Sequence, residues 1–114
     1  MKSKLGDKAR LQHIMDCIEE INLATNGLVQ SEFEQNHILR IAVVKWLEII
    51  GEAANHLSSE LKVTNKEIEW RHVIGLRNIV VHEYFGINFS TIWNIVQNQI
   101  PQLKTTIEKL INRL

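Results

Sequence analysis

Apolar residues recur at steps of three and four along most of the chain, which is the spacing of one face of an α-helix. From Lys4 to Ala24 these positions are Leu11, Ile14, Met15, Ile18 and Ile21. Asn26-Gly27 predicts the end of this helix, because both residues tolerate the left-handed conformation of a C-terminal cap. The pattern therefore opens with one long amphipathic helix.

A second helical region is expected from near Ser31 to about Leu57. Ser31 and Glu34 have the spacing of a capping box, in which the two side chains satisfy free backbone amides at a helix start. The pattern also allows a break near Gln35-Asn36. The centre of this region is apolar on more than one side, which predicts the most buried helix of the protein.

Polar residues then indicate a connector over Ser58–Lys66, and a third helix is expected from about Glu67 or Trp70 to Tyr84. Gly86 is the expected stop of that helix. The best strand-like run, 79–81, is too short to predict a sheet. The third helix therefore continues the all-helical pattern.

The last helix is expected to start after a cap at Asn88 or Ser90 and to continue to Leu114. Pro101 lies inside its apolar pattern and lacks a backbone N–H, so it should kink the helix near Gln97. Four or five helices with short connections indicate an all-α fold, an antiparallel bundle.

Composition limits the possible functions. The 114 residues of the chain, 1–114, make one domain by length. Thirteen Lys and Arg balance thirteen Asp and Glu, which argues against a protein that coats nucleic acid non-specifically, so any RNA site must be a local patch. Cys17 is the single cysteine, which excludes an intramolecular disulfide and a zinc site built mainly from thiolates.

No segment has the pattern of a signal peptide or a membrane span. The first ten residues are charged throughout. The most apolar stretch, Ile41–Ile50, is interrupted by Lys45 and Glu48 and is too short to cross a bilayer. We therefore expect a cytoplasmic protein without a membrane partner.

The densest cluster of reactive side chains is the segment Trp70–Tyr84, which contains Arg77, Asn78 and His82. A His can move protons near neutral pH, and an Arg can hold a phosphate, but neither is an activated nucleophile. The set therefore suits a substrate that supplies its own nucleophile, such as the 2′-hydroxyl of RNA. The carboxylates do not have metal-ligand spacing with these His residues, so we expect neither a metal nor another cofactor.

The helical spacing leaves this site open in a single chain. Asn78 and His82 are four residues apart and project side by side, whereas Arg77 and His82 diverge by roughly 140° around the helix. Two copies facing each other across a twofold axis can converge two Arg and two His on one cleft. A homodimer is therefore expected.

The segment resembles the signature of the HepT-like branch of the HEPN superfamily, which is Arg, four residues, His, one residue and Tyr. Here these are Arg77, His82 and Tyr84. The similarity extends over nearly the whole chain, and its further matches are Trp70-Arg71, Gly75-Leu76, Tyr84-Phe85-Gly86-Ile87-Asn88, Ile50-Gly51-Glu52-Ala53-Ala54, Trp93 and Ile100-Pro101-Gln102-Leu103.

The resemblance implies the toxin of a type II toxin–antitoxin system: an all-helical dimer with a composite site at its interface and metal-independent endoribonuclease activity. It implies that Arg77 and His82 are catalytic and that Asn78 helps to position the phosphate or the His. It also implies a partner, a nucleotidyltransferase antitoxin that transfers AMP to Tyr84. A bulky, charged AMP group there would block and repel the RNA phosphate.

Glu52 is a candidate supporting residue, because a carboxylate on the most buried helix is costly unless it is paired. Its expected partner is Arg77 or Arg71, and the alternative is a partly exposed Glu in a salt bridge along its own helix. A locally basic stretch, formed by Lys62, Lys66, Arg71 and Arg77, can guide RNA phosphates.

Two other functions stay open. The helical dimer can be a non-catalytic nucleotide-binding or docking partner of a nucleotidyltransferase, and the zero net charge favours this reading. It can also be a helical interaction protein that uses Trp46, Trp70 and Trp93 as its interface, although three Trp in a bundle more often pack in the core.

Overall fold

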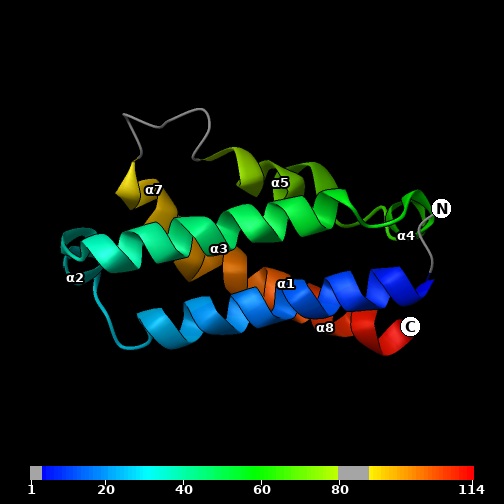
Figure 1. The fold of residues 1–114 in the computed structure, drawn as a ribbon, viewed down its shortest axis with the longest axis horizontal. Helices are drawn as coiled ribbons and strands as arrows, with labels where there is room; N and C mark the ends of the chain where they lie inside the picture. Colours follow the sequence, from blue (N-terminus) through cyan, green and yellow to red (C-terminus); the bar gives the residue numbers. More distant parts are fainter. Residues whose placement is uncertain (1–3, 80–87) are drawn as a thin grey trace.

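The structure, a computed structural model, describes residues 4–79 and 88–114, with side chains from Gly6 onward, and every regular element in these ranges is a helix. The predicted all-α fold is confirmed. The long helices α1 (Lys4–Thr25) and α3 (His37–Asn55) lie side by side in opposite directions, and α8 (Ile100–Arg113) packs along α1 (Figure 1). The shorter elements are α2 (Gln30–Gln35), α4 (Ser59–Thr64), α5 (Trp70–Gly75), the 3₁₀ turn η1 (Leu76–Asn78), α7 (Phe89–Asn94) and the π-helical turn η2 (Ile95–Gln99).

The core lies where the apolar faces of the three long helices meet. The predicted apolar positions of α1 are buried, and they meet equally buried positions of α3 and α8. These core residues include Leu11, Ile14, Ile18 and Ile21 of α1, Val43, Leu47 and Ile50 of α3, and Ile100 and Ile107 of α8. Each such side chain contributes about 1.5–3 kcal/mol when it leaves water, so this seam dominates the stability of the fold.

Cys17 also belongs to this seam. Its side chain is buried, and burial raises the pKa of the thiol, with the negative charges of Asp16 and Glu20 acting in the same direction. A thiol that stays protonated is a poor nucleophile. Cys17 is therefore a packing residue, as its isolation in the sequence predicts.

The second helical region divides at Asn36, which confirms the break near Gln35-Asn36. The Asn36 side chain accepts a hydrogen bond from the backbone N–H of Leu39 at 3.0 Å and so caps α3. The expected capping box of Ser31 and Glu34 is wrong, because α2 starts at Gln30. It is the carboxylate of Glu32 that accepts from the backbone N–H of Val29, at 2.9 Å.

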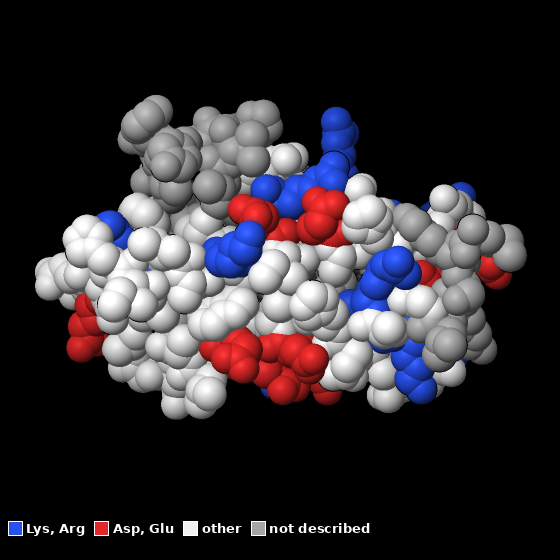
Figure 2. Space-filling model, in the orientation of Figure 1, with Lys and Arg blue, Asp and Glu red and all other residues white. Residues whose placement is uncertain are grey.

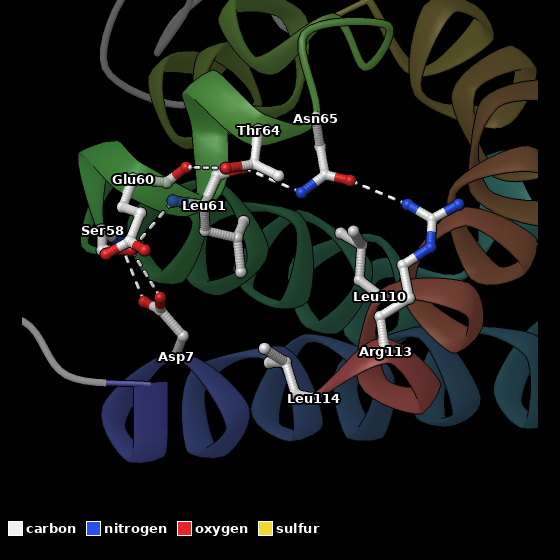
Figure 3. Close-up of a pocket in the computed structure, with 9 residues that line it drawn as sticks. All are labelled: Asp7, Ser58, Glu60, Leu61, Thr64, Asn65, Leu110, Arg113 and Leu114. Atoms are coloured by element: carbon white, nitrogen blue, oxygen red, sulfur yellow. Dashed lines mark hydrogen bonds between the residues drawn. The ribbon is translucent and has the colours of Figure 1, made fainter.

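The segment expected to be a plain connector contains the short helix α4, so that prediction is wrong. Ser58 caps α4, since its hydroxyl oxygen accepts from the backbone N–H of Leu61 at 3.1 Å. The buried carboxylate of Asp7 accepts from the backbone N–H of Ser58 at 2.8 Å and from its hydroxyl (Figure 3). Arg113 donates to the Oδ1 atom of buried Asn65 at 2.8 Å. Side chains of α1 and α8 thus hold α4 in place.

The third helix starts at Trp70 and tightens into η1 at Leu76. Its expected continuation to Tyr84 and the stop at Gly86 lie outside the described residues. The last helical region starts after Asn88, whose side chain accepts from the backbone N–H of Ser90 at 3.0 Å. Asn88 rather than Ser90 is therefore its cap.

The predicted disturbance at Pro101 takes the form of the π-helical turn η2. Because Pro101 has no N–H, the regular hydrogen-bond ladder cannot pass through it. Immediately before it, the backbone N–H of Ile100 donates to the carbonyl of Ile95, five residues back. The wider turn lies around Gln97, where the irregularity was expected. Within the described residues, no helix is long and apolar enough to cross a membrane.

Candidate active site

The cluster predicted to carry chemistry borders a cavity of about 670 Å³ where α1, α3 and η1 meet. Arg77 and Asn78 of η1 form one side of it, and Glu52 and His56 come from α3. Figure 2 shows positive and negative side chains side by side over the middle of α3, and an acidic patch over α1. The face in view is therefore mixed in charge, which agrees with a local site rather than a broad basic stripe.

The absence of a side chain at Gly51 allows η1 to lie close against α3. A Cβ atom at Gly51 would be 2.3 Å from the backbone N of Arg77 and 2.8 Å from both the Arg77 Cβ and the Ile74 carbonyl oxygen. Distances below 3.0 Å are sterically forbidden for such contacts. Only glycine permits this approach, so the backbone of Arg77 is seated directly against α3.

Glu52 follows Gly51 and joins two basic side chains. Its Oε2 atom lies 3.3 Å from Nη1 of Arg77, and its Oε1 atom lies 2.9 Å from Nε2 of His56. Of the two predicted partners, Arg77 and not Arg71 pairs with this carboxylate. The carboxylate also pairs with His56, four residues later on the same helix. The side chain of Glu52 is 53% exposed, so the alternative of a partly exposed Glu in a salt bridge along its own helix also holds.

The exposure of this pair bears on what Arg77 can do. The side chain of Arg77 is 32% exposed, and ion pairs in contact with water contribute about 0–1 kcal/mol to stability. The guanidinium can therefore exchange the carboxylate for a substrate phosphate at small cost to the fold. Its planar donor fork matches two phosphate oxygens at once.

The other predicted residues fall into three groups. Asn78 is exposed and borders the cavity beside Arg77. His82 and Tyr84 lie outside the described residues. Arg71 and His72 border a different cavity, between α5 and α8, and His72 pairs there with Glu69.

The three Trp residues support packing rather than an exposed interface. Trp70 is buried, and its ring N–H donates to the backbone carbonyl of Asn65 at 3.1 Å. Trp93 is partly buried against Phe33, with ring centroids 5.4 Å apart, and Trp46 packs partly against the core.

The sequence analysis did not single out several of the charged and polar residues that border the cavity. His56 is one of them, although its spacing of four residues from Glu52 on one helix is a usable signal. Arg10 and His13 of α1 also border the cavity, and only the packing of α1 against α3 brings them there. Among the described residues, no group of three or more His, Cys, Asp and Glu is placed to hold a metal ion.

Comparison with known proteins identifies the family of this chain. The sequence profile of the family described as Ribonuclease HepT-like matches residues 14–110. The chain belongs to this family. A HepT-like relative from Thermococcus cleftensis, named "Probable ribonuclease HepT", is 35% identical, and the match covers 94% of this chain and 97% of the relative.

Two further relatives are similar over most of their length. "Putative RNase MJ1380" of Methanocaldococcus jannaschii is 35% identical, and the match covers 93% of this chain and 97% of the relative. "Putative RNase TTE0752" of Caldanaerobacter subterraneus subsp. tengcongensis is 31% identical, and the match covers 90% of this chain and 92% of the relative. No solved structure matches the chain. The family assignment thus agrees with the similarity of the Arg77 segment to the HepT-like signature. The names of the relatives point to ribonuclease chemistry.

Proposed function

We propose that this HepT-like protein is a metal-independent endoribonuclease that cleaves RNA by attack of the substrate's own 2′-hydroxyl. The observation that carries the proposal is the position of Arg77. Its guanidinium is partly exposed at the edge of a cavity, and the Gly51 contact fixes its backbone. The names of the relatives, which refer to RNases, support the same reaction class.

In the proposed reaction His82 takes the proton of the 2′-hydroxyl, and the oxygen attacks the adjacent phosphorus. Arg77 stabilises the negative charge that builds on the phosphate oxygens. Asn78, next to Arg77 in η1, helps to orient the phosphate or the imidazole. The P–O5′ bond then breaks and leaves a 2′,3′-cyclic phosphate and a 5′-oxygen, which takes up a proton to become the 5′-hydroxyl. His82 enters this scheme through the sequence motif, since it lies outside the described residues.

The exposed face of α3 supports a homodimer with a composite site. Ile38 and Ile41 on this helix are 82% and 71% exposed, and they lie at helical spacing on the same side as Glu52. An exposed apolar patch on a helix can serve as an interaction surface, and these two side chains would be its centre. A twofold axis near the middle of α3, between these residues and Glu52, would bring the Arg77 of a second copy toward the same cleft.

We further propose that the protein is a toxin of the cytoplasm, paired with a nucleotidyltransferase antitoxin that transfers AMP to Tyr84. The motif places Tyr84 two residues after His82. An AMP ester at that position would compete with RNA for the charge of Arg77 and fill the space of the substrate.

The first test is RNA cleavage in the presence of EDTA. Purified wild-type protein should fragment total RNA, and Arg77→Ala and His82→Ala should each lower the rate by about 10²-fold or more. Lys109→Ala is the control, because this exposed basic residue of α8 lies outside the cavity of Arg77 and should leave the rate unchanged.

Retained cleavage in His82→Ala would contradict the role of His82. Intact RNA with the wild-type protein, together with tight nucleotide binding, would instead favour a non-catalytic docking partner of a nucleotidyltransferase. The mixed charge of the face in Figure 2 is the observation that favours this second function.

The dimer is tested by sedimentation of the wild-type chain and of the double variant Ile38→Asp, Ile41→Asp. We expect a dimer for the wild type and a folded monomer for the variant, because a buried carboxylate without a partner is costly at an interface. Equal masses for the two proteins would contradict the assignment of this face.

The modification is tested with a nucleotidyltransferase antitoxin of the proposed type and ATP. Mass spectrometry should show AMP on the wild-type protein and loss of its RNA cleavage. Tyr84→Phe should keep its cleavage activity and resist the inhibition, since it lacks the acceptor hydroxyl. An AMP group found on Tyr84→Phe would refute Tyr84 as the acceptor.

A further inference from the structure

The proposed cleavage needs two proton transfers, and the sequence motif supplies one imidazole in each chain. One proton leaves the 2′-hydroxyl, and another must reach the 5′-oxygen, because an alkoxide is a poor leaving group. General acid catalysis of such a step typically contributes about 10²–10⁴-fold in rate. In the homodimer proposed above, the proton transfer to the 5′-oxygen can fall to His82 of the second copy or to another imidazole beside Arg77 in the same chain.

His56 has the placement for this task. It borders the same cavity as Arg77 and Asn78, and its side chain is 50% exposed. The Glu52 carboxylate holds its Nε2 atom at 2.9 Å, and among the described residues Nδ1 has no hydrogen-bond partner. The ring thus has one nitrogen that fixes its orientation and one that is available to a substrate.

His56 is linked to Arg77 through a single side chain, that of Glu52. One carboxylate, Glu52, contacts the imidazole with one oxygen and the guanidinium with the other. A phosphate held by Arg77 would therefore lie next to the imidazole of His56, which ends α3 as its C-terminal cap.

We propose that His56 is the general acid of the reaction, an inference that rests on the proposed ribonuclease function. As the O2′–P bond forms and the P–O5′ bond breaks, the proton on Nδ1 of His56 passes to O5′. The products are the cyclic phosphate, a neutral 5′-hydroxyl and a neutral His56, which regains its proton from water while His82 releases to water the proton of the 2′-hydroxyl. Glu52 keeps the ring oriented throughout.

The other His residues are weaker candidates for the second proton transfer. His13 borders the cavity, but within the described residues it has no carboxylate partner and no link to Arg77. His72 pairs with Glu69, the residue before α5, much as His56 pairs with Glu52, but it borders the cavity between α5 and α8. His72 is therefore a matched control for His56.

The test uses two oligoribonucleotides that differ at one atom. The first has an ordinary linkage at the cleavage site, and in the second sulfur replaces the bridging 5′-oxygen. A thiolate leaves without receiving a proton, so the second substrate does not need a general acid. Cleavage rates are measured for the wild-type protein, His56→Ala, His56→Gln and His72→Ala, after circular dichroism has confirmed that each is folded.

His56→Ala and His56→Gln should cleave the ordinary linkage about 10²–10⁴-fold more slowly than the wild type and the sulfur linkage at nearly the wild-type rate. The Gln variant matters because its amide can still bond Glu52 while being unable to transfer the proton. His72→Ala should match the wild type on both substrates, and His82→Ala should be slow on both.

Equal losses on both substrates in the two His56 variants would overturn the proposal, since that result indicates a positioning role through Glu52. Wild-type rates on both substrates would overturn it as well. A wild-type protein that cleaves neither substrate would refute the proposed ribonuclease function itself, and the role of His56 with it.

Discussion

The candidate site depends on one close backbone contact, that of Gly51 in α3 with Arg77 in η1. The contact leaves no room for a side chain, and it brings a 3₁₀ turn against the most apolar helix of the bundle. The neighbouring residue Glu52 then meets the guanidinium, and His56 follows one helical turn later. One short stretch of α3 thus sets the position of the phosphate-binding group and orients the imidazole beside it.

The residues that stabilise the fold are separate from those proposed to act on RNA. Stability comes from the buried seam of α1, α3 and α8, whereas the charged side chains at the cavity are partly exposed and weakly paired. Arg77 can therefore change partners without loss of the core. With no net charge to attract nucleic acid at a distance, recognition of RNA has to come from this local geometry.

The sequence predicted the features that depend on local periodicity. The amphipathic pattern placed α1, α3 and α8, and the break at Asn36 and the irregularity before Pro101 were expected from capping and from the missing N–H. The sequence did not predict α4, because this six-residue helix is held by Asp7 and Arg113, which lie 51 and 48 residues from their partners. Short elements with distant anchors have no periodic signal of their own.

The site was predicted in part. Glu52 was expected to pair with Arg77 or Arg71, and the structure shows Arg77. The contact of Gly51 was not predicted, because it joins residues far apart in the sequence, and His56 was missed although its spacing from Glu52 was visible. The roles of His82 and Tyr84 still rest on the family resemblance.

The most direct measurement is the rate of RNA cleavage by Gly51→Ala and Gly75→Ala, with urea unfolding measured on the same proteins. A Cβ at Gly75 meets no atom within 4 Å, so this variant should cleave like the wild type and be as stable or slightly more so. Gly51→Ala should lose about 1–3 kcal/mol of stability. Under conditions where it stays folded, it should cleave about 10²-fold more slowly, because Arg77 is displaced. A folded Gly51→Ala protein with the wild-type rate would contradict the account.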